Sequence, residues 1–330
     1  MSSFCADRGA ADRRDVDHRD IDRGDIDHGD GVITGGFTDW HVHLHLIDPS
    51  LLAASPLSRV HDLGGDPSEL ARVAAGGITP AASASASPSG EDPPSPIELL
   101  HAGAFLTPPG GYPSDRSWAP ADTYREIGGE REARAAVAEM VAAGASAIKV
   151  ASNAEAGPVF SDEVFRVIVA AAREAGLPVV AHAEGRGEAL RAARLGASIL
   201  AHSPFSERLT APELTELAAT TTWISTLDIH GWGDYGTEHA VAVANVAGFV
   251  RAGGRLRYGT DMGNGPVPVG LNPRELDSLA AAGLTPEQVL ATLTPADPRP
   301  ADATRVWVPR DEHGRLDIAA ARRLEPPGFA

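Results

Sequence analysis

The chain has 330 residues, of which 43% are hydrophobic, and a formal charge of −17 at neutral pH. Its length suits one large domain, such as an α/β barrel of roughly 250 residues. The negative charge argues against nucleic-acid and anionic-membrane partners, which need basic patches. No apolar run approaches the ~20 residues of a membrane span, and no signal-peptide pattern opens the chain. With the single Cys5, which excludes an internal disulfide, these features predict a cytoplasmic protein.

Residues 1–30 are an acidic, low-complexity tail in which similar units repeat every five residues between Arg14 and His28. This composition cannot bury enough apolar surface to fold, so we predict a disordered arm. A weak cation-binding repeat is the alternative interpretation.

From Gly31 onward, strand patterns alternate with helical patterns. Strands are predicted at 32–43, 58–63, 100–107, 146–150, 178–182, 198–202, 222–227 and 256–260. Helices are predicted at 67–75, 130–143, 161–175, 187–195, 211–219, 237–252, 273–282 and 286–293. Ser161 and Thr285 provide N-cap signatures for two of these helices. The alternation predicts an α/β fold with a closed (β/α)8 TIM barrel over residues 31–296.

Two segments depart from the alternation. Residues 79–98 are rich in Ser, Ala and Pro and are predicted to be an insertion in the barrel. Residues 297–330 are too short for an independent domain, so we predict a C-terminal extension that packs on the barrel. Within it, a short strand is expected at 306–308 and a small helix near 317–323.

The first barrel strand carries three histidines at alternating positions. Because successive side chains of a strand point to opposite faces, His41, His43 and His45 share one face. Three imidazoles make a poor apolar core but offer metal ligands. This stretch therefore indicates a metal site, if other strands supply further ligands.

Lys149 is the only lysine among the 28 basic residues, and it lies in a strand that reads as buried. A buried ammonium is costly unless it is neutralised or paired. Lys149 is therefore the strongest pointer to chemistry outside the histidine stretch.

Further polar residues follow apolar runs at the ends of other strands: His182, His202 and Asp261. A lone histidine after a strand is more often a hydrogen-bonded structural residue. Together with His41, His43 and Lys149 they make six polar residues at strand ends. Six on one rim are better explained as a functional site, because the carboxyl ends of barrel strands form the catalytic face.

Taken in order, these motifs resemble the amidohydrolase superfamily of metal-dependent hydrolases. Asp39-Trp40-His41-Val42-His43 matches the family's D-x-H-x-H motif, and Ala147–Val150 matches its strand-four lysine segment. The two later histidines and Gly259-Thr260-Asp261 complete the pattern. The resemblance is closest to the branch with a carboxylated lysine, which includes prolidase-like and imidazolonepropionase-like enzymes. Most members carry an accessory β-sandwich, which we expect to be absent or vestigial in this chain.

The resemblance implies two divalent metal ions, with zinc as the first expectation and manganese, iron or cobalt as alternatives. The implied ligands are His41, His43 and Asp261 for one ion and His182 and His202 for the other, bridged by a carbon dioxide-derived carboxylate on Lys149. It implies attack of a metal-bridging hydroxide on a C–N bond of an amide, cyclic amide or dipeptide, with Asp261 as general acid and base. Asp39 would orient a histidine from behind, and His45 would not be a ligand.

We expect a small-molecule substrate to contact the loops after the strands, through Tyr112, His230, Trp232 and Asn264. His230 would polarise the scissile carbonyl. A mononuclear deaminase, which would not need Lys149, and a lactone or ester hydrolase are the alternative activities. A non-enzymatic, metal-dependent binding protein is the third reading. The sequence leaves open whether the protein is a homo-oligomer.

Overall fold

The computed structural model describes residues 26–27, 29–79, 96–294 and 304–324. None of the helices in these ranges is long and apolar enough to cross a lipid bilayer. The predicted tail lies outside these ranges up to residue 25, but Ile26–Asp27 form a short strand, β1. Most of the insertion predicted at 79–98 also lies outside them. Its ends meet in an antiparallel bridge, where Ile78 and Ile97 exchange two backbone hydrogen bonds of 2.9 Å.

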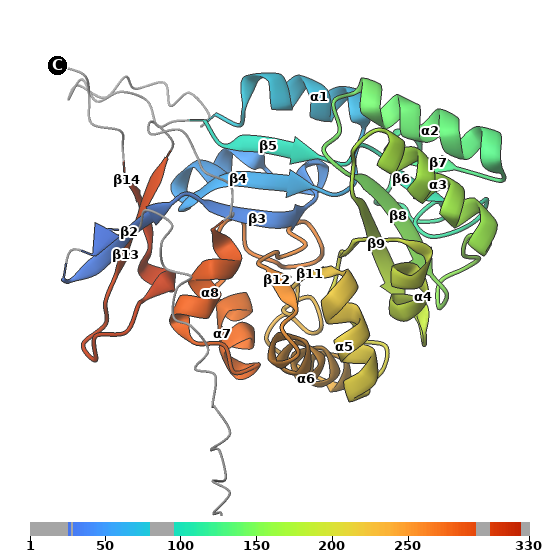
Figure 1. Ribbon diagram of the computed structural model, residues 1–330. Helices are drawn as coiled ribbons and strands as arrows, with labels where there is room; N and C mark the ends of the chain where they lie inside the picture. Colours follow the sequence, from blue (N-terminus) through green and yellow to red (C-terminus); the bar gives the residue numbers. More distant parts are fainter. Residues whose placement is uncertain (1–25, 28, 80–95, 295–303, 325–330) are drawn as a thin grey trace, which may run out of the picture.

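Parallel strands form the barrel that the sequence predicts (Figure 1). In chain order they are β3 (Phe37–Val42), β4 (Leu57–Asp62), β5 (Glu98–His101), β6 (Phe105–Thr107), β8 (Ile148–Asn153), β9 (Val179–Glu184), β10 (Ile199–Leu200), β11 (Thr222–Ile224) and β12 (Arg255–Arg257). The predicted strand at 100–107 is divided, since β5 pairs with β4 whereas β6 pairs with β8 and with β7 (Tyr124–Glu126). The barrel closes where Trp40 N donates to Tyr258 O at 3.0 Å and Val42 bridges Met262.

Helices follow the strands at the predicted places. They are α1 (Pro67–Gly76), α2 (Glu130–Ala142), α3 (Asp162–Glu174), α4 (Glu188–Leu195), α5 (Ala211–Thr220), α6 (Thr237–Arg251), α7 (Pro273–Ala281) and α8 (Pro286–Leu293). The Ser161 hydroxyl accepts from Val164 N at 3.3 Å at the start of α3, and Thr285 forms a capping box with Gln288 at the start of α8. After β3 two 3-10 helices, η2 (Leu44–Leu46) and η3 (Pro49–Ala54), take the place of an α-helix.

Small and branched apolar side chains fill the barrel interior. The cluster comprises Trp40, Leu63, Ala102, Ala147, Val180, Ile199, Ala201 and Ile224, all less than a tenth exposed. Since these residues come from most of the barrel strands, the centre of the barrel is a packed core, and polar groups are left for its ends.

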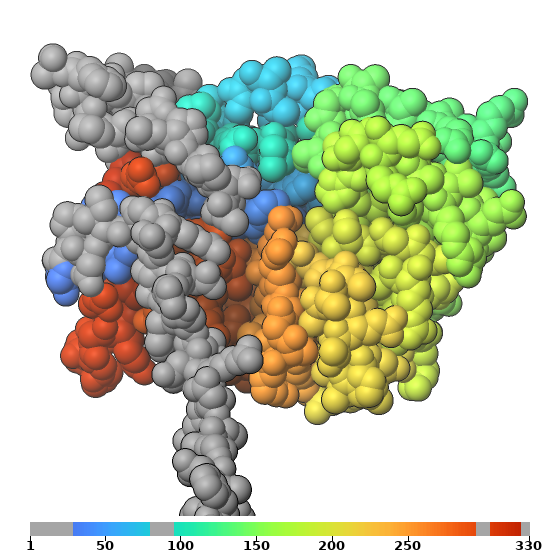
Figure 2. Space-filling model, in the orientation of Figure 1, coloured from blue at the N-terminus to red at the C-terminus, as the bar shows by residue number. Residues whose placement is uncertain are grey.

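The two ends of the described chain meet in a separate four-stranded sheet with the order β1-β2-β13-β14. β2 (Gly31–Gly35) pairs antiparallel with β13 (Arg305–Pro309), which pairs with β14 (Arg322–Leu324). In Figure 2, the dark blue and red residues accordingly lie side by side at one edge of the molecule. This small sheet is built from both ends of the chain, as an accessory sandwich would be, and corresponds to the vestigial form that the sequence allowed.

Two local predictions were wrong. The strand predicted at 32–43 is two strands, because β2 pairs with β13 in the small sheet while β3 pairs with β4 in the barrel. The small helix predicted near 317–323 is a 3-10 turn, η5 (Ile318–Ala320), followed by β14. In the first place the deciding partner, β13, lies near the other end of the described chain; in the second, β14 pairs with the same β13 across a short antiparallel connection. Local periodicity reveals neither pairing.

Candidate active site

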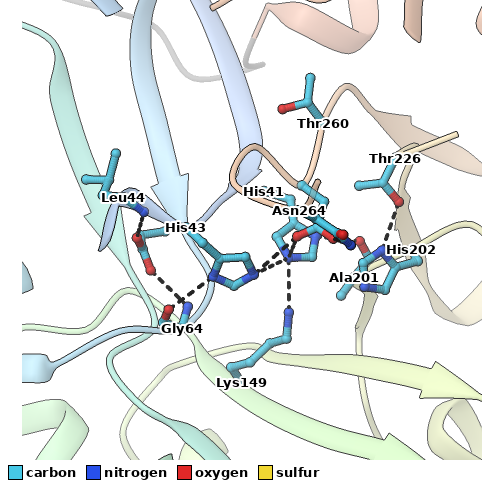
Figure 3. Close-up of polar contacts among 12 residues, drawn as sticks. His41, His43, Leu44, Gly64, Lys149, Ala201, His202, Thr226, Thr260 and Asn264 are labelled. Carbon is cyan, nitrogen blue, oxygen red and sulfur yellow. Dashed lines mark hydrogen bonds and ion pairs between the residues drawn. The ribbon is translucent and has the colours of Figure 1, made fainter. Parts of the chain in front are cut away.

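Polar side chains gather at the carboxyl end of the barrel (Figure 3). His41 and His43 come from the end of β3, Lys149 from β8, His182 from β9, His202 from the residues after β10, and Asp261 from those after β12. All six are more than nine-tenths buried. The structure thus brings together the whole set that the sequence singled out, because parallel strands place their carboxyl ends on one rim.

The Nε2 atom of His41 is the centre of this group. It lies 3.3 Å from His43 Nε2, 3.3 Å from Lys149 Nζ and 3.1 Å from Asp261 Oδ1. Asp261 Oδ1 is also 3.2 Å from His43 Nε2. The ring of His202 is adjacent, with its centroid 4.8 Å from that of His41. Ligand atoms of His41, His202 and Asp261 all lie within 4.8 Å of one another, close enough to share one metal ion.

Backbone carbonyl groups fix which nitrogen of each β3 histidine carries the proton. His41 Nδ1 lies 2.9 Å from Ala201 O, and His43 Nδ1 lies 3.0 Å from Gly64 O. A carbonyl oxygen only accepts, so each Nδ1 must donate and each neutral ring turns its Nε2 lone pair toward the group. Figure 3 shows these two contacts on the sides of the rings that face away from the group.

The resulting group is rich in electron pairs. Two Nε2 lone pairs and Asp261 Oδ1 face one another across 3.1–3.3 Å. Asp261 Oδ1 is buried and has no hydrogen-bond partner among the described residues. Buried polar atoms normally have partners. A divalent cation would satisfy all three atoms, so the donor set fits a metal ion.

Burial favours the neutral forms of His41, His202 and Lys149. It lowers the pKa of His41 and of His202 well below the ordinary value of 6.5. Burial also lowers the pKa of Lys149 from 10.5 to about 7, although the charges of Asp261 and Asp62 oppose the shift. A free amine is thus accessible at Lys149 near neutral pH, which is the form that can react or coordinate.

Asp39 supports the site through the backbone. The sequence predicted that it orients a histidine, and its Oδ1 does accept from the main-chain N of His41 at 3.0 Å, but it does not contact the ring. Asp39 also accepts from Thr260 Oγ1 at 2.6 Å and from Thr260 N at 3.2 Å. These bonds hold the chain just before Asp261, whose φ of 55° lies in the left-handed region. Asp39 therefore stabilises an otherwise unfavourable backbone that aims Asp261 inward.

His182 lies at the edge of the group and has a different partner. Its ring centroid is 4.9 Å from that of His202, but its Nε2 lies 3.1 Å from Glu184 Oε2. Glu184 also accepts from Asn153 Nδ2 at 2.6 Å. Sequence reasoning missed Glu184. The available signal was its position two residues after His182 on a strand, which puts both side chains on one face.

A cavity of about 220 Å³ opens beside the group. All four residues predicted to contact substrate line it: Tyr112, His230, Trp232 and Asn264. A second cavity of about 250 Å³ shares Tyr112 and Asn264 and adds Trp118. Asn264 Nδ2 donates to Asp261 Oδ2 at 2.8 Å, which leaves the unpartnered Oδ1 of Asp261 facing the histidines. His45, which the sequence kept out of the ligand set, is exposed in η2, with its ring centroid 6.0 Å from that of His43.

The loop after β11 supplies His230 and Trp232. His230 Nε2 is buried without a hydrogen-bond partner in the described part of the chain, and the His230 ring packs on Phe205 with the centroids 4.2 Å apart. Trp232 has a φ of 48°, which is unfavourable for a bulky residue, and its Nε1 donates to Asn264 O at 3.1 Å. Phe205 and Glu238 also line the cavity, and sequence reasoning missed both because no local pattern marks them.

Comparison with known proteins gives a consistent picture. A model of the amidohydrolase family matches residues 32–297. No curated protein matches the chain.

Several solved structures share the fold. One is a Xaa-Pro dipeptidase with bound methionine in the active site, at 15% identity and a TM-score of 0.66, covering 86% of this chain and 84% of that one. Another is the A. niger ochratoxinase, at 16% identity and a TM-score of 0.64, covering 90% and 84%. A prolidase complexed with N-methylphosphonate-L-proline has 17% identity and a TM-score of 0.56, covering 89% and 87%. At these identities the likeness establishes the fold and not the reaction.

Proposed function

Because the chain belongs to the amidohydrolase family, we propose that it hydrolyses the C–N bond of an amide, cyclic amide or dipeptide-like small molecule. The proposed cofactors are two divalent metal ions, with zinc as the first expectation and manganese, iron or cobalt as alternatives. His41, His43 and Asp261 would hold one ion, and His182 and His202 the other. A carboxylate formed from carbon dioxide on Lys149 would bridge them. We propose that the protein acts in the cytoplasm, as a monomer or a homo-oligomer.

One observation carries the proposal: the Nε2 atoms of His41 and His43 and Oδ1 of Asp261 face one another, with Lys149 Nζ as the proton-bearing member of the ligand set beside them. Both β3 histidines donate their Nδ1 protons to carbonyl groups, and Asp261 Oδ1 has no hydrogen-bond partner among the described residues. Metal-binding histidines ordinarily donate their other ring N–H in this way, which fixes the tautomer.

Lys149 supports the binuclear version of the proposal. Its Nζ lies 3.3 Å from His41 Nε2, it is 1% exposed, and burial lowers its pKa to about 7. Reaction of a lysine amine with carbon dioxide needs the neutral amine, which arginine cannot provide. All the other Lys or Arg positions of the chain are arginine. The chain therefore uses arginine for surface charge, and the lysine at position 149 is better explained by its reaction with carbon dioxide.

Residues around the metal ligands would transfer the proton, polarise the carbonyl group and position the substrate. When bound, divalent ions supply Lewis acidity and lower the pKa of water. Asp261 would accept the proton of the attacking water and return it to the leaving nitrogen, with Asn264 holding its second oxygen at 2.8 Å. His230 would donate from Nε2 to the scissile carbonyl, since His230 lines the cavity and its Nε2 has no hydrogen-bond partner among the described residues. Tyr112 and Trp232 would shape the cavity wall around the substrate.

Metal analysis combined with Lys149→Ala tests the proposal. The wild-type protein, loaded with zinc or manganese, should bind two ions per chain and turn over some member of a panel of amides, cyclic amides, dipeptides and lactones. Lys149→Ala should lose one ion and at least about 100-fold in kcat/KM, because ligand-shell changes typically cost 10–100-fold or more. Acetate or propionate should restore part of the activity, while chloride at the same ionic strength should not. Activity that Lys149→Ala leaves unchanged would refute the binuclear proposal.

A mononuclear deaminase is the second candidate. It is favoured by the compact trio of His41, His202 and Asp261, whose ligand atoms lie within 4.8 Å of one another without Lys149. One ion per chain, ammonia release from aminated heterocycles and full activity in Lys149→Ala would support it. Ester or lactone turnover in the panel would support the lactone or ester hydrolase as the activity of the same site. If two ions are bound and nothing in the panel is cleaved, a metal-dependent binding protein replaces the enzyme.

A further inference from the structure

The cavity beside the metal-ligand group has an unbalanced charge. Fifteen of the described residues line it. Among them the acidic residues are Glu184, Glu238 and Asp261, and the only lysine or arginine is Lys149. Lys149 is 1% exposed and faces His41. The part of the wall that substrate can reach is therefore negative.

The second cavity does not change this balance. Its lining contains Asp261 but neither lysine nor arginine. Arg116 lies near the mouth, with its guanidinium carbon 5.7 Å from the centre of the Tyr112 ring. It is not part of either lining, and its Nε pairs with Asp115 at 3.3 Å. Apart from the proposed metal ions, the described residues that line these cavities include no lysine or arginine other than the buried Lys149.

Glu238 and Glu184 both lie by His230. Glu238 Oε2 is 3.9 Å from His230 Nδ1, and Glu184 lines the same cavity from the end of β9. The other ring nitrogen of His230, Nε2, is buried and unpartnered among the described residues. The two carboxylates therefore line a cavity together with a buried nitrogen that a polar substrate atom could pair with. This distinguishes them from a cluster of acidic residues on the surface.

Aromatic rings complete this part of the wall. Phe205 packs on His230, and Tyr112 stacks on His182 with the ring planes 25° apart. Trp232 is 39% exposed at the rim. Aromatic faces together with carboxylates form the usual recognition chemistry for a protonated amine, which is attracted to both.

We propose that the substrate carries a protonated amine, which binds between Glu184 and Glu238 against these aromatic rings while the scissile bond lies by Asp261 and His230. This inference rests on the proposed function, because it assigns the charge of the substrate of that same site. It also predicts that a substrate with a free carboxylate in place of the amine binds more weakly, because the described residues of the cavity offer that group no arginine and only the buried Lys149.

The test compares amides that differ only at the end of a carbon chain of fixed length: a protonated amine, a methyl group or a carboxylate, placed on either side of the scissile bond. For the metal-loaded wild type, kcat/KM for the amine should exceed that for the methyl compound by about tenfold, the factor expected for one hydrogen bond to a charged group. Glu238→Gln should reduce this ratio by most of that factor. Glu163→Gln, an exposed change on α3 outside the cavity, should leave the ratio unaltered.

Binding provides a readout that does not need turnover. Calorimetric titration of the metal-loaded protein with protonated n-pentylamine, n-pentanol and pentanoate should rank the amine first, and Glu184→Gln or Glu238→Gln should weaken that binding about tenfold. Preference for the carboxylate or the neutral compound in either experiment would overturn the inference. If the amine binds with this dependence and no amide is cleaved, the hydrolase proposal fails while the charge assignment survives. If the methyl or carboxylate compounds are cleaved with no preference for the amine, the charge assignment fails while the hydrolase proposal survives.

Discussion

The ion pair between Asp228 and Arg274 holds the loop that carries His230 and Trp232. Asp228 follows β11 and is fully buried, and it accepts from Arg274 Nε and Nη2, both at 2.8 Å. Its main-chain oxygen accepts from Trp232 N at 2.8 Å. We predict that Arg274→Met destabilises the protein and displaces this loop, because the Asp228 carboxylate would stay buried without its cation.

The expected magnitude follows from burial. In Arg274→Met the carboxylate keeps only Asn272 Nδ2, at 2.8 Å, and Tyr235 OH, at 2.9 Å. Removing one member of a buried pair costs 3–5 kcal/mol. Arg274 is 37% exposed, so solvent screening reduces the expected loss to about 2–3 kcal/mol. The Asp228→Asn/Arg274→Met double variant should recover part of this loss, since the uncompensated charge is gone.

Arg194→Met is the matched control. Arg194 makes a similar two-pronged contact with Glu216, at 2.6 and 2.8 Å, but the Glu216 side chain is 39% exposed, whereas that of Asp228 is 0% exposed. Its loss should cost less than about 1 kcal/mol. Urea unfolding of the three variants, compared at equal m-values, gives the free energies. If Arg274→Met costs no more than Arg194→Met, the reasoning from burial is wrong. A parallel fall in kcat/KM for Arg274→Met alone would link the pair to the placement of His230.

Three further predictions concern the metal group. Metal-free Lys149→Met should be more stable than wild type by up to about 4 kcal/mol at pH 7, because the unfolded chain binds a proton that the folded Lys149, with its pKa lowered to about 7, does not hold. Since the folded pKa lies below the unfolded one, this gain should shrink toward zero as the pH rises to 10.5 in urea melts, and a pH-independent gain would contradict it. Thr226→Val should weaken metal affinity about 10–100-fold, since it removes the hydroxyl 2.9 Å from His202 Nδ1; Thr226→Ser should retain it in competition titrations with a chelator. Gly259→Ala should cost about 1–3 kcal/mol in thermal or urea unfolding, because its methyl group would lie 2.3 Å from Ile224 Cγ2; stability equal to wild type would show that the barrel wall yields there.

The sequence by itself determined the order of strands and helices and the residues at the barrel mouth. His182, His202 and Asp261 each follow an apolar run, and in a parallel barrel the chain order of such runs already brings their ends to one rim. Lys149 stood out because its burial could be inferred from the apolar residues around it. These inferences need only local patterns and one rule of topology.

Only the tertiary structure decided the contacts that depend on distant segments. The carbonyl groups that fix the tautomers, Ala201 O and Gly64 O, carry no side-chain signal and lie 160 and 21 residues from their histidines. The division of 32–43 into two strands depends on β13, near the other end of the described chain. Glu238 and His230 are close in the sequence, but no periodic pattern covers the loop after β11 that brings the start of α6 beside His230. Such pairings arise from packing, where backbone groups and exposed carboxylates acquire their roles from their neighbours in space.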